Sequence, residues 1–273
     1  MVDHIASSSG SRPGPWSNRV ANVGAPRWEG LSGEDLADHL GLPYVVVYGM
    51  VASTMDPAHL LAAEGAPAGT LVIADHQTAG RGRGGHAWIS PPGSGIWMTL
   101  IERPTDSAAL ELLSIRSGIH AAQALDPYTD RPVGIKWPND LYVGGRKLAG
   151  ILTEARWQEQ QLLWVAVGIG INVRPPATVA SSVGLDGTVD RLAVLGAVVT
   201  ALRTAARLDG MLNKEEMREC KARDVARGRA CCEPTAGRVV GIGARGELRV
   251  RTATGVQAFR TGSLVLDQNA EVA

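Results

Sequence analysis

Residues 133–154 read VGIKWPNDLYVGGRKLAGILTE, and this stretch says most about the fold. Two short apolar segments, Val133–Lys136 and Leu141–Val143, flank a Trp-Pro-Asn-Asp turn. Gly144-Gly145 follows, and such a pair between apolar segments is typical of a two-residue hairpin turn. Lys147–Glu154 then returns as an antiparallel strand. The stretch predicts a hairpin that brings two lysines, an amide and a carboxylate toward one rim.

The segments on either side of this hairpin show strand and helix patterns. Further strands are expected at Tyr44–Tyr48, Thr70–His76, Gly95–Glu102 and Leu162–Ile171. Helices are expected at Thr54–Glu64, Ser107–Leu125, Val189–Leu208 and Lys214–Asp224. After about residue 226, short alternating segments between glycine turns predict a small antiparallel barrel. We therefore expect an α+β catalytic domain over residues 44–225, with a mostly antiparallel sheet and flanking helices. A small β-barrel domain is expected over residues 226–273.

Residues 1–43 are rich in Ser, Gly and Pro, and we expect a flexible segment with one short helix at Ser32–Leu40. The first thirty residues lack the basic start and apolar stretch of a signal peptide. No apolar run approaches the roughly 20 residues of a membrane helix. Three cysteines do not make a disulfide framework. A cytoplasmic protein with no membrane partner is expected.

The overall charge argues against a protein that coats itself in nucleic acid. Lys plus Arg and Asp plus Glu both number 27, so the formal net charge is zero. Proteins that neutralise many phosphates normally carry a basic excess. We expect no nucleic-acid partner.

A glycine-rich loop at residues 77–88 carries the clearest binding chemistry. It reads QTAGRGRGGHAW and places Arg81 and Arg83 among glycines. Glycine lets the backbone turn its amides toward an anion, and arginine adds fork-shaped donors for carboxylate or phosphate. The loop also matches the dinucleotide pattern G-x-G-x-x-G, but that pattern requires a helix to follow at once. The sequence HAWISPPG that follows cannot form one, so we reject the dinucleotide interpretation.

Two further clusters are compatible with a site or with a plain structural role. Lys136 and Lys147 in the hairpin could be ordinary surface lysines. The run Val167-Gly-Ile-Gly-Ile-Asn172 puts glycines inside an apolar strand, which suits close approach of a ligand or of another backbone.

The three clusters in this order resemble the biotin–protein ligases across roughly residues 44–266. The loop GRGRGGHAW resembles the family's Gly-Arg-Gly-Arg loop, and KWPNDLYVGGRKLAGILTE is similar to its KWPND…KLAGIL segment almost letter for letter. GIGINV is similar to the third family segment. The resemblance implies a class II synthetase-like catalytic domain and an SH3-like C-terminal barrel. It also implies ATP-dependent formation of biotinyl-5′-AMP, then transfer of biotin to a lysine of a biotin carboxyl carrier protein domain.

The resemblance also assigns site residues. Lys147, Arg83 and Asp140 would carry catalysis. The biotin site would comprise Ser53, Thr54, Met55, Gln77, Arg81, Gly82, Arg83, Lys147, Gly150, Leu152, Gly168 and Gly170. The ATP site would comprise Arg83, His86, Trp88, Lys136, Asn139, Asp140 and Asn172. Mg²⁺ would accompany ATP, and no side-chain cage for a metal can be read from the sequence.

This chain departs from the family pattern at several positions. Met55 and Asp56 follow Ser53-Thr54 where the family has Asn after Ser-Thr, and His86 stands where many members have arginine. Gly84 replaces a frequently basic position. The basic residue that some members use near the nucleotide has no clear match in the C-terminal domain, and Arg260 is a candidate for it.

Three alternatives stay open. Some members carry an N-terminal winged helix that represses genes, but the single helix before residue 44 predicts a monofunctional enzyme. A lipoate or octanoate transferase has a related fold without the KWPND…KLAGIL segment. A protein that only stores biotin would lack ATP-dependent activation. The sequence leaves a homodimer open.

Overall fold

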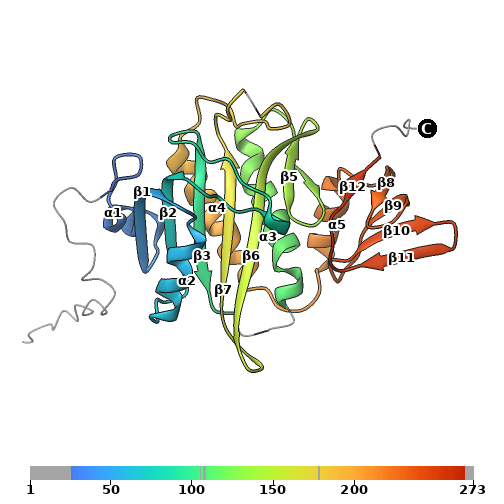
Figure 1. Ribbon diagram of the computed structural model, residues 1–273, viewed down its shortest axis with the longest axis horizontal. Coiled ribbons are helices and arrows are strands. Elements are labelled where there is room, and N and C mark those ends of the chain that lie inside the picture. The colour runs from blue at the N-terminus through green and yellow to red at the C-terminus, as the bar shows by residue number, and fades with distance from the viewer. Residues whose placement is uncertain (1–25, 105, 107–108, 178, 268–273) are drawn as a thin grey trace, which may run out of the picture.

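The computed structural model describes residues 26–104, 106, 109–177 and 179–267. Its main feature is a seven-stranded sheet in the order β1-β2-β3-β7-β6-β5-β4 (Figure 1). Only β1 and β2 pair in parallel, and every other neighbouring pair is antiparallel. The expected α+β fold with a mostly antiparallel sheet is confirmed. The strands are β1 (Tyr44–Val51), β2 (Thr70–Gln77), β3 (Gly95–Glu102), β4 (Gly134–Lys136), β5 (Asp140–Val143), β6 (Arg146–Gln158) and β7 (Gln161–Asn172).

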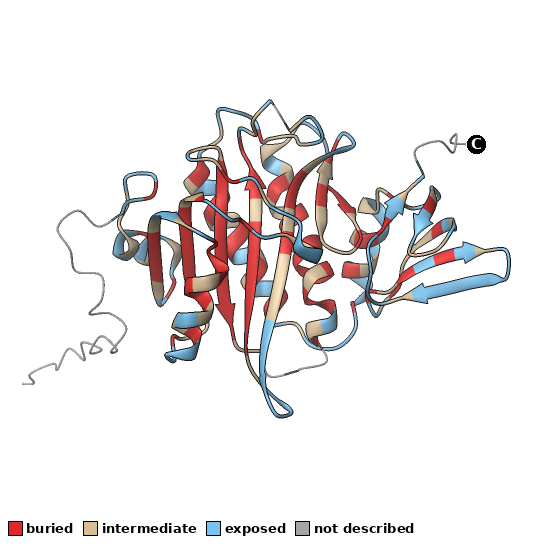
Figure 2. Ribbon diagram, in the orientation of Figure 1, coloured by how far each residue is buried: buried red, intermediate tan, exposed pale blue. Residues whose placement is uncertain are grey.

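Helices cover this sheet unevenly. Figure 1 shows α3 and α4 behind the strands, whereas α2 lies in front. Figure 2 shows that the central strands are buried, while the tip of the β6–β7 hairpin is exposed. Large aliphatic side chains from the strands and from α3 and α4 form the main core. The helices are α1 (Gly33–Leu40), α2 (Met55–Ala63), α3 (Leu110–Leu125), α4 (Arg191–Ala206) and α5 (Lys214–Arg223), with short 3-10 turns η2 (Arg83–Gly85) and η4 (Asp126–Tyr128). No helix in the described ranges combines the length and apolarity that crossing a bilayer requires.

The central hairpin follows the pattern of its residues. Gly144 and Gly145 separate β5 from β6 with φ of 56° and 80°. Both values lie in the left-handed region that glycine adopts freely, as the predicted two-residue turn requires. The expected turn is confirmed, and it returns β6 alongside β5.

The C-terminal unit is a separate five-stranded sheet in the order β11-β10-β9-β8-β12. Every pairing in it is antiparallel, and a small core around Val239, Leu248 and Val250 fills one face. β11 and β12 are the two edges and do not pair, so the expected closed barrel is not confirmed. The strands are β8 (Ala230–Glu233), β9 (Gly237–Ile242), β10 (Leu248–Thr252), β11 (Gly255–Phe259) and β12 (Val265–Leu266).

The stretch before β1 packs against the main core. α1 confirms the short helix, and Ser32 caps it through a capping box with Asp35. Trp28 and Leu36 are buried, and the Arg191 guanidinium lies 4.7 Å from the Trp28 ring centroid. Burial of apolar side chains against the domain stabilises this stretch, and its flexibility stays a prediction. The expectation for residues 1–25 lies outside the described residues.

Candidate active site

A cavity of about 270 Å³ lies over the middle of the large sheet, under the glycine–arginine loop. Strand register explains its floor. Gly150 of β6 pairs with Gly170 of β7, and Leu152 pairs with Gly168. Residues two apart on a strand share a face, so the three glycines lie on one face of two neighbouring strands. The three glycines carry only a hydrogen atom where their neighbours carry side chains. This face of the sheet therefore leaves room for a ligand.

Two large side chains already lie on that floor. A Cβ at Gly170 would lie 2.4 Å from Nε1 of Trp88, and a Cβ at Gly168 would lie 2.9 Å from Sδ of Met55. Real Cβ atoms do not come that close, so a side chain at Gly170 would displace the Trp88 ring, and one at Gly168 would shift the flexible Met55 side chain. The Trp88 indole N–H is buried and has no hydrogen-bond partner among the described residues.

One end of the cavity is a network of neutral hydrogen-bonding groups. The backbone N–H of Thr54 donates to Oε1 of Gln77 at 2.9 Å, and Nε2 of Gln77 donates to Oγ of Ser90 at 2.9 Å. The hydroxyls of Thr54 and Thr99 lie 2.8 Å apart, and Thr99 donates to Sδ of Met55 at 3.3 Å. Buried polar groups are costly unless they are bonded, so this network holds a defined set of donors and acceptors.

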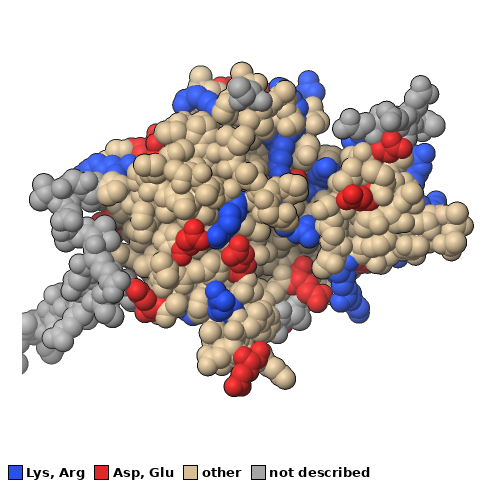
Figure 3. All heavy atoms as spheres, viewed as in Figure 1, with Lys and Arg blue, Asp and Glu red and all other residues tan. Residues whose placement is uncertain are grey.

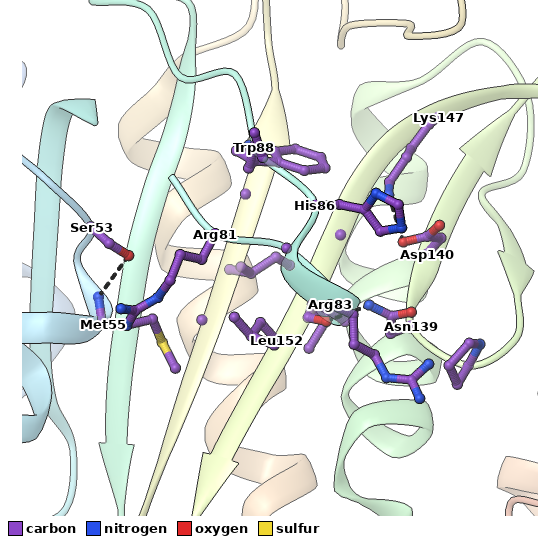
Figure 4. Close-up of a pocket in the computed structure, with 18 of the residues that line it drawn as sticks. Ser53, Met55, Arg81, Arg83, His86, Trp88, Asn139, Asp140, Lys147 and Leu152 are labelled. Atoms are coloured by element: carbon purple, nitrogen blue, oxygen red, sulfur yellow. Dashed lines mark hydrogen bonds and ion pairs between the residues drawn. The ribbon is translucent and has the colours of Figure 1, made fainter. Parts of the chain in front are cut away.

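Cations gather at the other end. Nζ of Lys147 lies 2.7 Å from Oδ1 of Asp140 and 5.1 Å from the ring centroid of Trp88. Lys136 also lines the cavity, and burial lowers its pKa, while nearby Asp140 raises it and nearby Lys147 lowers it further. Figure 4 shows Lys147, Asp140 and His86 at this end, with Ser53 and Met55 at the other. On the molecular surface, basic side chains gather around the hollow between the central body and the C-terminal unit (Figure 3). The cavity can thus hold a neutral polar group at one end and an anion at the other.

The glycine–arginine loop closes over the cavity as a short excursion from β2. The N–H of Gly82 donates to the His86 carbonyl at 2.7 Å, and the N–H of Trp88 donates to the Gly80 carbonyl at 2.8 Å. Nη1 of Arg83 donates to the carbonyl of Gly262 at 2.8 Å. That bond ties the loop to the C-terminal unit, from which Ser263 and Leu264 also line the cavity.

Residues 49–172 match the model of the biotin/lipoate A/B protein ligase family. The chain contains a domain of this family. The chain is 41% identical over 145 residues to the bifunctional ligase/repressor BirA of Bacillus subtilis, a match that covers 53% of this chain and 43% of that protein. It is 37% identical over 110 residues to the biotin–[acetyl-CoA-carboxylase] ligase of Mycobacterium tuberculosis, which covers 38% of this chain and 40% of that one. The matches thus span under half the length of these curated relatives.

Solved structures share the fold over a longer stretch. The biotin protein ligase of Aquifex aeolicus in complex with biotin and ATP aligns with a TM-score of 0.63 at 24% identity, covering 82% of this chain and 98% of that one. The biotin protein ligase of Leishmania major in complex with biotinyl-5-AMP aligns with a TM-score of 0.55 at 22% identity, covering 80% and 98%. Because these sequence identities are below 25%, the similarity to the two structures concerns the fold alone.

The cavity over the large sheet gathers the predicted site residues with one exception. The lining includes Ser53, Thr54, Met55, Gln77, Arg81, Gly82, Arg83, His86, Trp88, Lys136, Asn139, Asp140, Lys147, Gly150, Leu152, Gly168 and Gly170. Asn172 does not line it. Its Nδ2 instead donates to the carbonyl of Lys147 at 3.3 Å, and its role at the nucleotide stays a prediction. Asn172 lies on the β7 strand beside the start of β6 and positions the Lys147 backbone.

Two other residues have different surroundings from those expected. The Asn139 side chain lines the cavity, but its amide donates to the Ile151 carbonyl at 2.7 Å and so holds the hairpin together. Arg260, the C-terminal candidate, pairs with Glu111 at 3.3 Å and does not line the cavity. Arg260 thus contacts α3 of the main body, and its role at the nucleotide stays a prediction.

Sequence reasoning missed several lining residues. Thr99 comes from β3, whose sequence has the pattern of a plain apolar strand. Ser263 and Leu264 come from the C-terminal unit, more than 160 residues farther along the chain. Thr99 is the one hydroxyl within GIWMTLIE, and that was the available signal. In the described ranges, no three His, Cys, Asp or Glu side chains cluster as they would around a metal ion.

Proposed function

We propose that this chain is a biotin–protein ligase. In the first half-reaction a carboxylate oxygen of biotin attacks the α-phosphorus of ATP, which forms biotinyl-5′-AMP and releases pyrophosphate. In the second, the ε-amine of a carrier lysine attacks the acyl carbon, AMP leaves and the amine loses a proton. The observation that carries the proposal is the glycine floor at Gly150, Gly168 and Gly170, between a neutral polar end and a cationic end, in a domain of this family.

The polar end suits a flat, uncharged head group such as the ureido ring of biotin. Ser53, Thr54 and Gln77 are nearly buried there and offer both donors and acceptors. The glycine floor leaves width for the fused rings, and Leu152 and Met55 add apolar contact. The acyl chain would then run along the floor toward Lys147.

The cationic end suits the reacting carboxylate and the phosphate. Lys147 would stabilise the negative charge that develops on the phosphate oxygens as the new bond forms. Arg83 and Lys136 would add positive charge to the same region, and His86 and Trp88 would border the nucleotide. Asp140 orients Lys147 through their 2.7 Å contact.

Mg²⁺ would arrive with ATP under this proposal. Asp140 is the only carboxylate among the residues that line the cavity, which fits an ion held mostly by phosphate oxygens and water with one protein ligand. When bound, the ion would offset phosphate charge. The protein's own contribution is the placement of Asp140 and Lys147.

The wider assignments belong to the same proposal. The protein substrate would be the biotin carboxyl carrier protein domain of a biotin-dependent carboxylase, and the reaction would take place in the cytoplasm without nucleic-acid or membrane partners. The C-terminal unit, for which we retain the SH3-like barrel as a prediction, would close one side of the cavity through Ser263 and Leu264. A homodimer is an option that light scattering would test.

The first experiment is ATP-dependent pyrophosphate release with biotin as the sole acyl substrate, with lipoate and octanoate in parallel. Release with biotin alone supports the proposal. Release with lipoate but not biotin assigns the other activity in the family's description. No release with any of the three substrates contradicts an activating enzyme and favours a protein that only binds.

A further inference from the structure

A second cavity lies where α5 meets the C-terminal sheet, and it shares no lining residue with the cavity over the large sheet. Its volume is about 480 Å³. Figure 1 shows α5 beside the C-terminal strands. Ile242 on its wall packs against both the main core and the C-terminal core. We call this cavity the junction groove, and the residues that matter for its chemistry are Lys214, Met217 and Lys221 of α5, and Val240, Ile242 and Arg249 of β9 and β10.

Basic side chains line both walls of the junction groove. Lys214 and Lys221 come from α5, and Arg249 comes from β10. All three are exposed, and none of them forms an ion pair with a carboxylate in the described part of the chain. Arg218, which also lines the groove, differs because Glu215 pairs with it. Three cations are therefore available to an anion from outside the chain.

One carboxylate lines the groove, and it offsets this charge only in part. Oδ1 of Asp224 accepts from the backbone N–H of Ala226 at 3.0 Å, while Oδ2 is buried with no hydrogen-bond partner among the described residues. Burial raises the pKa of Asp224, against the lowering influence of the Ala226 and Arg227 backbone N–H groups. This carboxyl thus holds its proton more readily than an exposed one would. The groove keeps an excess of positive charge.

The shape of the junction groove suits an extended anion better than a small one. Lys214 and Lys221 are seven residues apart on α5, which is about 10 Å along the helix axis. An extended peptide covers that length in about three residues. Partly buried Met217, Val240 and Ile242 provide an apolar floor for aliphatic side chains. No aromatic residue is among the described lining residues, so the groove offers no platform on which nucleic-acid bases would stack.

We propose that the junction groove binds an acidic peptide segment of a partner protein, with carboxylates on Lys214, Lys221 and Arg249 and aliphatic side chains on the apolar floor. Charge complementarity determines the sign of the partner. The formal net charge of zero conceals this local excess, because the balancing carboxylates lie elsewhere on the chain. The inference does not depend on the proposed ligase chemistry, since the two cavities have separate linings.

Fluorescence anisotropy with a labelled peptide of Glu-Glu-Leu repeats tests this docking site on the full chain. In the double variant Lys221→Glu, Arg249→Glu, we expect binding at least about tenfold weaker than in the parent, because two attractive charge pairs become repulsive. Unchanged affinity would overturn the proposal. A peptide of Glu-Glu-Gly repeats should bind the parent about fivefold more weakly than the Leu peptide, because it loses apolar contact. Equal binding of the two peptides would overturn the assigned role of the floor.

A charge-matched variant separates the groove from general electrostatics. Arg131→Glu, Arg156→Glu makes the same change in net charge at two exposed positions outside the groove. It should bind the peptide within about twofold of the parent, since distant exposed charges are screened. Equal loss of affinity in both double variants would contradict a specific groove. A single-stranded oligonucleotide that binds more tightly than the peptide, and loses binding in the Lys221, Arg249 variant, would overturn the assigned class of partner.

Lysine acetylation provides a second measurement, which locates the peptide on the chain. The chain has four lysines: Lys214 and Lys221 are exposed at the junction groove, and Lys136 and Lys147 line the cavity over the large sheet. Saturating Glu-Glu-Leu peptide should protect the first pair several-fold from limited acetylation, as read by mass spectrometry, and leave the second pair unchanged. Protection of Lys136 and Lys147 alone would overturn the assignment. Neither outcome requires activation of biotin, so failure of this proposal and failure of the ligase proposal are distinguishable.

Discussion

Nζ of Lys147 lies 2.7 Å from Oδ1 of Asp140, and the two side chains are 29% and 21% exposed. The backbone of Lys147 is fixed as well: its N–H donates to the Ser181 carbonyl at 2.9 Å, and its own carbonyl accepts from Val183 and Asn172. The central cation of the cavity is therefore placed before any ligand arrives. Preorganised charge of this kind costs no rearrangement when negative charge develops during reaction.

We expect Lys147→Ala to reduce adenylate formation by at least about a hundredfold, because removal of one preorganised donor has effects of that order. Biotin-dependent pyrophosphate release measures it directly. Lys221→Ala, an exposed lysine on α5, is the control and should remain fully active. Near-normal activation of biotin by the Lys147 variant would remove Lys147 from its assigned role.

Arg83→Gly should let the adenylate escape. The variant loses the 2.8 Å bond to the Gly262 carbonyl that ties the loop to the C-terminal unit. We expect pyrophosphate release to continue while labelling of a bystander protein rises about tenfold, since lid opening controls retention. Streptavidin blotting of added albumin would measure the labelling. Arg245→Gly in an exposed turn of the C-terminal unit is the control, and equal labelling by both variants would contradict the prediction.

Gly170→Ala should force Trp88 off the floor of the cavity. The added Cβ would lie 2.4 Å from Nε1 of Trp88, and the β7 backbone cannot move away inside a buried sheet. We expect changed tryptophan fluorescence and at least about a tenfold loss of kcat/KM, because small misplacements in a site are costly. Gly118→Ala, in α3, meets only ordinary 3.9 Å contacts and should fold at least as stably. A Gly170 variant with parental fluorescence and activity would show that Trp88 is not held as described.

His120 should make the chain less stable in mild acid. Burial lowers its pKa, against the raising influence of Glu216, whose Oε1 lies 3.6 Å from Nε2 of His120. As pH falls below about 6.5, the unfolded chain takes up a proton that the folded chain does not, so the free energy of unfolding falls. Urea unfolding from pH 7.5 to 5.5 measures this, and His120→Gln should flatten the profile. If His120→Gln follows the parental profile, the acid sensitivity arises elsewhere.

Much of the architecture could be predicted because its signals are local. The Gly144-Gly145 turn needs two residues with positive φ, and the run from Val189 to Leu208 has helical periodicity that α4 (Arg191–Ala206) follows closely. Register was not predictable to the same degree. The pairing of Gly150 with Gly170 depends on how β6 and β7 align, and that alignment depends on burial across the whole sheet.

The sequence by itself determined the composition of the candidate site: the glycine–arginine loop, the two lysines of the hairpin and the glycines of two strands are all visible as short patterns. The tertiary structure decided which of these side chains face which partner. It turned Asn172 toward the Lys147 backbone, placed Arg81 between Asp56 and Glu154, and brought Ser263 to the cavity from the C-terminal unit. The physical reason is that residue type and spacing specify local backbone preference and chemistry, whereas ion pairs and cavity walls form between segments whose approach depends on packing of the whole chain.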